Sequence, residues 1–282
     1  MKRRTFVKSV LIAGISQSVL NADEISDRSL RKITLAQLCD PQLGFGKDGF
    51  DADVARLKQE IEMVNELQPD VVLFAGDMVN DIADEKAVKT FLKLIAEIKP
   101  PVMLTAGNHD LHDPVTDEGL KRYRDYFGQD FSTRECKGYL IISANSQLWW
   151  RAAPQEEQDR HEKLLRDALQ SAKKKEQPVI LLTHIPPFVK SIDEEDEYFN
   201  LPKPKRTELL QLCESSGVLL WLAGHTHLTA KRNYNDIAIL NGETTSQNFD
   251  KRPFGFRLLT IYPDNKPDNK FDWEFQELKT SN

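Results

Sequence analysis

Residues 102–110 read Val-Met-Leu-Thr-Ala-Gly-Asn-His-Asp, a short apolar run that passes at once into small and polar residues. Apolar runs of this length, followed by turn-forming residues, are typical of strands buried inside an α/β core. Open α/β sheets bind their ligands just beyond the carboxyl ends of such strands. We therefore expect Gly107-Asn108-His109-Asp110 to lie at a sheet edge where a ligand binds.

The same step from an apolar run to polar residues occurs at four other places along the chain. The polar groups there are Asp40-Pro41-Gln42, Gly76-Asp77, His184 and Gly224-His225-Thr226-His227. Each has a structural explanation when taken singly, because Asp77 can cap a helix, Asn108 favours a turn and a lone His184 is common in cores. Their repetition in order, each after an apolar run, favours one shared site. The glycines at 76, 107 and 224 are expected to provide sharp turns at the strand ends.

Predicted strands and helices alternate through most of the chain. Apolar runs predict strands at 33–38, 71–74, 102–105, 139–144, 179–183 and 219–223. Helical spacing of apolar residues predicts helices at about 53–67, 84–98, 156–172 and 205–216. Beyond Thr229 only strands are predicted, at 237–240, 255–262 and 270–277, with a tight turn at 263–266. No internal repeat or flexible linker divides the chain, so a single α/β domain over residues 30–280 is expected.

The composition is that of an ordinary globular protein. The chain has 282 residues, of which 40% are hydrophobic and 29% charged, and its net charge is −6. An acidic balance argues against general binding to nucleic acid or to an anionic membrane surface. The three cysteines at 39, 136 and 213 are widely spaced and suggest no disulfide framework, so we interpret them as buried small apolar residues.

The N-terminus has the pattern of an export signal. Met1-Lys2-Arg3-Arg4-Thr5-Phe6-Val7-Lys8 is followed by a weakly apolar stretch at 10–20, which resembles a bacterial twin-arginine signal peptide over residues 1–22. The stretch is too short to span a bilayer, and no cysteine follows it that could carry a lipid, so no stable membrane anchor is expected. We expect recognition by the export machinery and a periplasmic or other extracytoplasmic location. The alternative is a cytoplasmic protein whose paired arginines occur by chance.

The residue types in the five polar groups suit metal-assisted hydrolysis. Carboxylates, an amide oxygen and imidazoles are suitable ligands for Mn, Fe or Zn ions. A carboxylate such as Asp77 can bridge two cations about 3.5–4 Å apart, the spacing found in two-metal hydrolases. Such a pair lowers the pKa of a bridging water, so that hydroxide is available near neutral pH, and stabilises charge on a phosphoryl group.

The order of these motifs resembles the calcineurin-like metallophosphoesterase superfamily over about residues 33–262. The resemblance implies an α/β fold, a four-layer αββα sandwich with mixed sheets, and a site for two divalent or mixed-valence metal ions at the sheet ends. It implies that the first metal is held by Asp40, Asp77, His227 and, as a further ligand, Gln42. The ligands implied for the second metal are Asp77, Asn108, His184 and His225. His109 is implied to protonate the leaving oxygen or to stabilise charge on the phosphoryl group.

Several stretches resemble a narrower branch, that of calcineurin-like phosphoesterase domain-containing protein 1. They are Asp40-Pro41-Gln42, Asn145-Ser146-Gln147, His184-Ile185-Pro186-Pro187-Phe188 and residues 191–201. The resemblance to this branch implies Ser/Thr protein phosphatase activity. The predicted export signal conflicts with a phosphoprotein substrate inside the cell.

Two positions depart from the wider superfamily pattern. Gln42 stands where most members have a histidine, and a neutral amide is a weaker ligand than imidazole. Asn80 stands where Ser/Thr phosphatases have an aspartate that orients the catalytic histidine. Asn80 can accept a hydrogen bond from His109 but brings no charge, so a slower enzyme or help from Asp81 or Asp110 is expected.

The substrate class follows less directly from the sequence. A metal-dependent phosphoesterase acting on phosphomonoesters, small molecules before proteins, is the leading hypothesis. A phosphodiesterase of the same superfamily and a non-catalytic metal-binding scaffold are the alternatives, and a nuclease is disfavoured by the acidic charge. The acidic tract at 193–197 is a candidate rim of the site, and Trp149-Trp150 are candidates for its wall or for the core. Candidate phosphate contacts are His112, Arg122, Arg124, Arg151 and Arg252, with an ordinary surface charge as the alternative for each, because exposed arginine is common.

Overall fold

The computed structural model describes residues 30–263 and 271–279, and their strands form two sheets. The five-stranded sheet has the order β11-β10-β1-β2-β3. β1 (Ile33–Leu38), β2 (Val71–Phe74) and β3 (Val102–Leu104) run parallel to one another. β10 (Gly255–Ile261) pairs antiparallel with both β1 and β11 (Phe271–Glu277), so the sheet is mixed.

The six-stranded sheet has the order β4-β5-β6-β7-β9-β8. Its four central strands are parallel: β5 (Tyr139–Ala144), β6 (Val179–Leu182), β7 (Val218–Ala223) and β9 (Ile237–Asn241). The two edge strands, β4 (Phe131–Cys136) and β8 (Ala230–Tyr234), are antiparallel to their neighbours.

The helices of the described residues are α1 (Phe50–Leu67), α2 (Glu85–Ile95), α3 (Asp117–Phe127), α4 (Gln147–Trp150), α5 (Gln155–Lys174) and α6 (Lys203–Ser215). Capping fixes some of their starts. The side chain of Asp84 accepts hydrogen bonds from the amides of Lys86 and Ala87 and so begins α2. None of these helices is long and apolar enough to cross a membrane.

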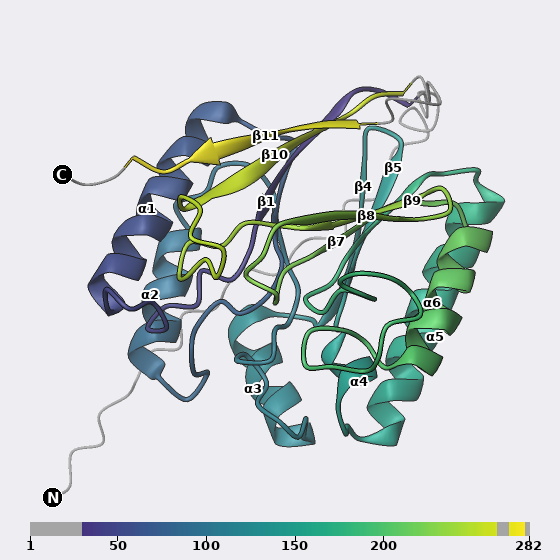
Figure 1. Ribbon diagram of the computed structural model, residues 1–282, viewed down its shortest axis with the longest axis horizontal. Helices are drawn as coiled ribbons and strands as arrows, with labels where there is room; N and C mark the ends of the chain where they lie inside the picture. Colours follow the sequence, from purple (N-terminus) through teal and green to yellow (C-terminus); the bar gives the residue numbers. More distant parts are fainter. Residues whose placement is uncertain (1–29, 264–270, 280–282) are drawn as a thin grey trace, which may run out of the picture.

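Three apolar cores hold the elements in four layers. One core joins α1 and α2 to the five-stranded sheet, with residues such as Leu57 and Phe74, and a second lies between the two sheets around Leu35 and Ile180. The third joins the six-stranded sheet to α5 and α6. Figure 1 shows the resulting order from left to right: α1 and α2, the two sheets, then α5 and α6. The predicted four-layer αββα sandwich with mixed sheets is confirmed.

The strands and helices predicted from apolar patterns are all present, with ends that differ by a few residues. α3, α4, β4 and β8 were not predicted. As expected, Cys39, Cys136 and Cys213 form no disulfide, and Cys39 and Cys213 are buried. Cys136, at the end of the edge strand β4, is only half-buried. The turn predicted at 263–266 lies mostly outside the described residues, and the signal peptide predicted at 1–22 lies wholly outside them.

Parallel pairing brings the strand ends that matter to one side of the molecule. The carboxyl ends of β1, β2 and β3 share one edge of their sheet, and those of β6, β7 and β9 share one edge of the other. The two edges meet, because Cys39 after β1 forms an isolated bridge with Thr244 after β9. The loops that leave both sheets are therefore neighbours.

Candidate metal centre

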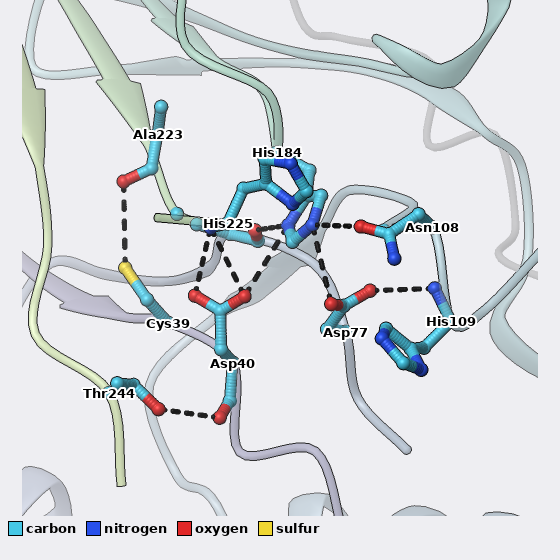
Figure 2. A network of polar contacts seen from close by, with 12 residues as sticks. Cys39, Asp40, Asp77, Asn108, His109, His184, Ala223, His225 and Thr244 are labelled. Atoms are coloured by element: carbon cyan, nitrogen blue, oxygen red, sulfur yellow. Dashed lines mark hydrogen bonds and ion pairs between the residues drawn. The ribbon is translucent and has the colours of Figure 1, made fainter. Parts of the chain in front are cut away.

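The centre is a buried group of two carboxylates and an imidazole at the junction of the two sheets. Asp40 follows β1, Asp77 follows β2 and His184 follows β6. Their ligand atoms all lie within 4.8 Å of one another, and the three residues are buried. Figure 2 shows the three side chains pointing toward a common space, with Asn108 and His225 beside them.

The imidazole of His184 is fixed by hydrogen bonding on one side and faces oxygen atoms on the other. Its Nδ1 donates to the carbonyl oxygen of Ala75 at 2.7 Å. Its Nε2 lies 3.0 Å from Asn108 Oδ1 and 3.4 Å from Asp77 Oδ2. An unprotonated Nε2 and these two oxygens are all acceptors, so the space between them suits a positive charge, either a proton or a metal ion.

Three further imidazoles are held in the same manner. His109 Nδ1, His225 Nε2 and His227 Nδ1 each lie within 3 Å of a main-chain carbonyl oxygen, at 2.8, 2.9 and 2.6 Å. The carbonyl partners belong to Asn80, Tyr198 and Gln247. Because a carbonyl only accepts, each of these ring nitrogens carries the proton, and the other nitrogen faces away from the carbonyl; in His225 and His227 its lone pair is available to a metal ion. Metal-binding histidines are commonly oriented in this way.

The two carboxylates are also anchored by main-chain groups. Both oxygens of Asp40 lie 3.1 Å from the amide of His225, and Asp40 Oδ1 lies 3.7 Å from His227 Nε2. Asp77 Oδ1 accepts from the amide of His109 at 2.9 Å, which leaves Oδ2 facing His184. Asp40 thus faces residues of the GHTH motif and Asp77 faces His184 and the GNHD motif.

The electrostatics of the group favour a cation at its centre. Burial alone would lower the pKa of His184, but the charges of Asp77 and Asp40 outweigh it and raise that pKa to about 9. Burial likewise opposes ionisation of Asp77, yet the charge of His184 holds the pKa of that carboxyl below its usual value. In Asp40 burial prevails and raises the pKa. A positive charge is therefore strongly stabilised between these side chains.

The backbone is in an unusual conformation at several of these positions. Asp40, Gln42, Asp77, His225 and His227 have φ values of 50°, 38°, 51°, 68° and 51°. Residues other than glycine rarely adopt positive φ, and each instance costs about 1–3 kcal/mol. Backbone strain concentrated on neighbouring polar residues is typical of a functional site.

Two glycines allow the close approach of the loops. Gly76 has φ 89°, and a Cβ there would lie 2.5 Å from His184 Nδ1. A Cβ on Gly107 would lie 2.1 Å from Asp77 Oδ1. The expectation of sharp turns is correct for the conformation of Gly76, but Gly107 and Gly224 lack a positive φ. At Gly107 the requirement is space beside the carboxylate.

Gln42 has the features of a ligand held close to the group. Its side chain is 1% exposed, and its Oε1 has no hydrogen-bond partner among the described residues. The main-chain amide of Gln42 donates to the main-chain carbonyl of Asp77 at 2.8 Å, which ties the loop after β1 to the loop after β2. A buried acceptor without a donor is costly unless a cation or water satisfies it, so the residue fits a metal site.

His109 is oriented by the backbone, not by a side chain. Its Nδ1 donates to the main-chain carbonyl of Asn80, so the amide side chain at this position is not its partner. Asp81 instead pairs with His112 at 2.9 Å, and Asp110 accepts from the amides of Met78 and Gly107. The charge that Asp81 or Asp110 was expected to lend to His109 is therefore directed elsewhere.

Two residues at the centre were not singled out as site residues from the sequence. Ser146 Oγ accepts from the amides of His184 and Ile185 at 3.2 and 2.9 Å, and so fixes the loop that carries the imidazole. Tyr198, directly after the acidic tract, lies beside both Asn108 and His225. Ser146 lies within a triplet already noted for its resemblance, and the acidic tract preceding Tyr198 was expected to form the rim.

The candidate phosphate contacts differ in their surroundings. Arg124 is bound to Asp130 and Glu157 through all three guanidinium nitrogens, so it links α3 to α5. Arg122 pairs with Glu118, His112 with Asp81, and Arg252 with Asp250. Arg151 is different, because its Nε is buried without a hydrogen-bond partner in the described part of the chain.

Arg151 is also linked to the metal centre through an aromatic ring. Its guanidinium lies 3.8 Å from the centroid of the Trp150 ring, and Trp150 contacts the ring of His225 edge-on at 5.2 Å. Asp113 lies 3.6 Å from Arg151 Nε and offsets part of the charge. The two tryptophans have different roles. Trp149 packs on buried His161 in the core, whereas Trp150 contacts His225 and forms part of the wall of the site.

Comparison with known proteins agrees with this geometry. Residues 33–228 match the family described as calcineurin-like phosphoesterase. The serine/threonine-protein phosphatase CPPED1 of Danio rerio is 27% identical over 250 residues, covering 81% of each chain. The Mus musculus protein of the same name is 29% identical over 230 residues, covering 77% of this chain and 72% of the relative. The superfamily and branch predicted from the motifs are confirmed, at a low level of identity.

A solved structure supports the fold in the same way. A dimetal phosphatase from Danio rerio superposes with a TM-score of 0.64 at 13% identity, covering 88% of this chain and 96% of the other. At that identity the likeness concerns the fold alone. Because the family match spans well over half of the 282 residues and a buried Asp/His metal-binding group lies at the expected sheet edge, this chain belongs to the calcineurin-like phosphoesterases, a family of metal-dependent phosphoester hydrolases.

Proposed function

We propose that this protein hydrolyses phosphomonoesters with two metal ions held where its two sheets meet. The observation that carries the proposal is the buried convergence of Asp40, Asp77 and His184 within 4.8 Å. Two carboxylates in so small a buried space need a compensating positive charge, which a metal ion can supply in place of a proton on His184. Proteins of known structure with this fold include a dimetal phosphatase, which supports a site for more than one ion.

In this proposal the ligands of the first metal are Asp40, Gln42, Asp77 and His227, and those of the second are Asp77, Asn108, His184 and His225. Oxygen and imidazole donors suit Mn, Fe or Zn, in divalent or mixed-valence pairs. When bound, the pair would neutralise phosphoryl oxygens and lower the pKa of a water molecule between them. The orphaned Oε1 of Gln42 supports its place in the first set.

His109 is the residue best suited to handle the proton of the leaving group. Its Nδ1 is committed to the carbonyl of Asn80, so Nε2 is the nitrogen that can exchange a proton with a substrate. The main-chain amide of His109 donates to Asp77 Oδ1, which ties this residue to a proposed metal ligand. A histidine placed in this way can protonate the departing oxygen or stabilise charge on the phosphoryl group.

Arg151 is the candidate for holding the phosphoryl group outside the metals. Its guanidinium is stacked on Trp150 and its side chain is 36% exposed, and Asp113 faces the buried Nε, so the terminal nitrogens are the donors available to an anion. Stacking limits its rotation, and a preorganised guanidinium can bind phosphate oxygens in a defined direction. A dianionic phosphomonoester gains more from such a contact than a diester with one negative charge.

Small phosphorylated molecules are the favoured substrates, with phosphoproteins as the second candidate. The relatives in Danio rerio and Mus musculus are named serine/threonine-protein phosphatases, which supports monoester chemistry in either case. The net charge of −6 disfavours nucleic acid as a substrate.

The choice between these substrates depends on where the protein works. We propose that residues 1–22 direct twin-arginine export to the periplasm or another extracytoplasmic compartment, away from intracellular phosphoproteins. Replacing Arg3 and Arg4 by lysines should retain the protein inside bacterial cells, as fractionation would reveal. Equal export of both forms would favour the alternative of a chance arginine pair, and a wild-type protein that stays inside would indicate a cytoplasmic enzyme.

The decisive experiment combines metal analysis with paired substrates. Purified protein, as prepared and after reloading with Mn²⁺ or Fe²⁺, is analysed for metal and then given a monoester and a diester of the same aryl alcohol. We expect two metals per chain and a metal-dependent rate that is higher for the monoester. A higher diester rate would establish the phosphodiesterase alternative, whereas two bound metals without turnover would indicate a metal-binding scaffold.

A further inference from the structure

The acidic tract belongs to an ordered segment, residues 189–201, which we call the rim loop. The side chain of Glu194 forms its centre, because it accepts from the amides of Val189, Lys190 and Ser191 at 2.7, 2.6 and 3.2 Å. The side chain of Asn200 donates to Glu194 Oε1 at 2.6 Å and to the carbonyl of Glu195 at 2.9 Å. Glu194 therefore organises the loop from inside and is not merely a solvated surface charge.

A buried arginine fastens the rim loop to α6. Arg206 is fully buried, and its Nε and Nη1 donate to the carbonyls of Ile192 and Leu201, each at 2.9 Å. Its Nη2 also donates to the carbonyl of Glu194. An arginine that satisfies loop carbonyls along its whole fork leaves the loop little freedom to move.

The rim loop contacts the metal centre through Tyr198. The carbonyl of Tyr198 accepts from His225 Nε2 at 2.9 Å, and its hydroxyl lies 3.3 Å from Asn108 Nδ2. Its ring packs on the imidazole of His225 at 4.9 Å between centroids. One residue of the rim loop thus contacts side chains from two other loops, one from each sheet.

These contacts fix the direction of both side chains. With Nδ2 of Asn108 donating to the tyrosine hydroxyl, its Oδ1 faces His184 Nε2 at 3.0 Å. With Nε2 of His225 donating to the Tyr198 carbonyl, Nδ1 of that ring keeps its lone pair. By contrast, His227 is oriented by the carbonyl of Gln247, which lies outside the rim loop.

We propose that the rim loop is a positioning device for the second metal, acting through Tyr198 on Asn108 and His225. The inference rests on the proposed function, because it assumes two metal sites with the ligand sets given above. Two ligands that belong to the first site alone, Asp40 and His227, make their orienting contacts outside the loop. Loss of a group that orients a ligand typically weakens metal binding 10–100-fold.

The test is a calorimetric titration of metal-free protein with Mn²⁺. Tyr198→Phe removes only the hydroxyl and keeps the carbonyl and the ring, so about a tenfold weakening of one of two binding steps is expected, with the other unchanged. Glu194→Ala loosens the whole loop and should weaken the same step further. Tyr234→Phe on β8 is the matched control and should leave both steps as in the wild type.

The outcomes separate the inference from the proposed function. Two unchanged steps in Tyr198→Phe, or an equal weakening of both, would overturn the inference while the dinuclear site stands. A wild-type protein without two binding steps would overturn the proposed function, and this inference with it. Should Glu194→Ala fail to fold, Tyr198→Phe decides alone, because replacing a hydroxyl that is part of a half-exposed side chain leaves the frame intact.

Discussion

Positive φ at Asp40, Gln42 and Asp77 has to be maintained by contacts that outweigh its cost. The carbonyl of Asp40 accepts from the hydroxyls of Thr244 and Ser246 at 2.9 and 2.8 Å, and its amide donates to the carbonyl of Gly76 at 3.3 Å. Folding thus supports a conformation that is locally unfavourable by about 1–3 kcal/mol per residue. The gain is that side chains from separate loops converge where a metal can bind.

Asp77 is the residue whose loss should be most damaging. We expect Asp77→Asn to abolish tight metal binding and turnover together, because a neutral amide cannot bridge two cations. The substitution is nearly isosteric and keeps an oxygen that can accept from the amide of His109. Metal analysis and aryl phosphate hydrolysis of the purified variant measure both effects. Asp84→Asn, at the exposed start of α2, should retain both properties, and wild-type turnover in Asp77→Asn would contradict the bridging role.

His109 should separate catalysis from metal binding. We expect His109→Ala to bind metal normally and to lose about 10²–10⁴ in kcat, the usual contribution of general acid catalysis. Because the main-chain carbonyl of Asn80 orients the ring, Asn80→Ala should reduce kcat by less than tenfold. Steady-state kinetics of the two variants decide the point. An equally large loss in Asn80→Ala would mean that the amide side chain takes part after all.

At the level of elements, buried strands were the most predictable part of the fold. β2, β6 and β7 are buried along their whole length, so their sequences are unbroken apolar runs that differ sharply from the loops. The polar residues that follow them were predicted as a group for the same reason. Once the strand ends are recognised, parallel pairing places them at one edge of the sheet, so the position of the site follows.

The elements that were not predicted lack this contrast. β4 and β8 are edge strands with mostly exposed or half-buried residues, and their sequences, Phe-Ser-Thr-Arg-Glu-Cys and Ala-Lys-Arg-Asn-Tyr, show no apolar run. α3 buries only Leu120 and Tyr123 along its length. Pairing with a neighbouring strand or packing on a formed core decides such elements, and neither is encoded in a local pattern.

Long-range contacts also explain what was missed in the centre. Tyr198 reaches Asn108, 90 residues away in sequence, and the acidic tract gave no sign that Glu194 folds inward onto the loop amides. The orientation of His109 by a carbonyl could not be predicted either, because every residue has one. Side-chain chemistry indicated which residues form the site, but the backbone acceptors that orient them follow only from the fold.

Gly107 offers a test of the close approach between two loops. In Gly107→Ala the new Cβ would lie 2.1 Å from Asp77 Oδ1 and 2.2 Å from its amide nitrogen, so the loops must separate. We expect a loss of stability of about 1–3 kcal/mol together with much weaker metal binding. Urea unfolding and Mn²⁺ titration measure the two effects.

The matched control has backbone strain without a clash. Gly217 has φ 77°, and a Cβ there would meet no atom within 4 Å. Gly217→Ala should therefore lose stability but keep the metal affinity of the wild type. If Gly107→Ala bound metal as tightly as Gly217→Ala, the spacing of the two loops would not matter for the site.

For the whole molecule, the centre is a junction between the two sheets. Asp40, Asp77 and Asn108 follow strands of the five-stranded sheet, whereas His184 and His225 follow strands of the other. A metal bound here would link the sheets and bind only the folded chain. Each site should add about 2.7 kcal/mol to the free energy of unfolding when free metal exceeds its Kd 100-fold.

Metal removal should therefore lower stability measurably. We expect treatment with a chelator to reduce the thermal midpoint of the wild type, and added Mn²⁺ to restore it. Asp77→Asn should show one midpoint regardless of metal, because it has lost the shared ligand. A midpoint of the wild type that does not respond to chelator would contradict a metal link between the sheets.

The stability of the protein in acid should depend on His161, which is not one of the proposed metal ligands. This histidine is buried between Phe131 and Trp149, and its Nε2 accepts from the amide of Asn145 at 2.9 Å, which requires a neutral ring. Burial lowers its pKa to about 4, against about 6.5 in an unfolded chain. The unfolded state therefore binds the extra proton first, and stability present above about pH 6.5 is lost as the pH falls toward 4.

The size of that loss is about 3 kcal/mol for a shift of this magnitude. His161→Gln keeps an acceptor for the amide of Asn145 but does not titrate, so its free energy of unfolding should fall less steeply between pH 7 and pH 4 than that of the wild type. Urea unfolding in the presence of a chelator measures the difference, and the titration of all other groups cancels in the comparison. Parallel curves for wild type and His161→Gln would mean that groups other than His161 account for the loss of stability in acid.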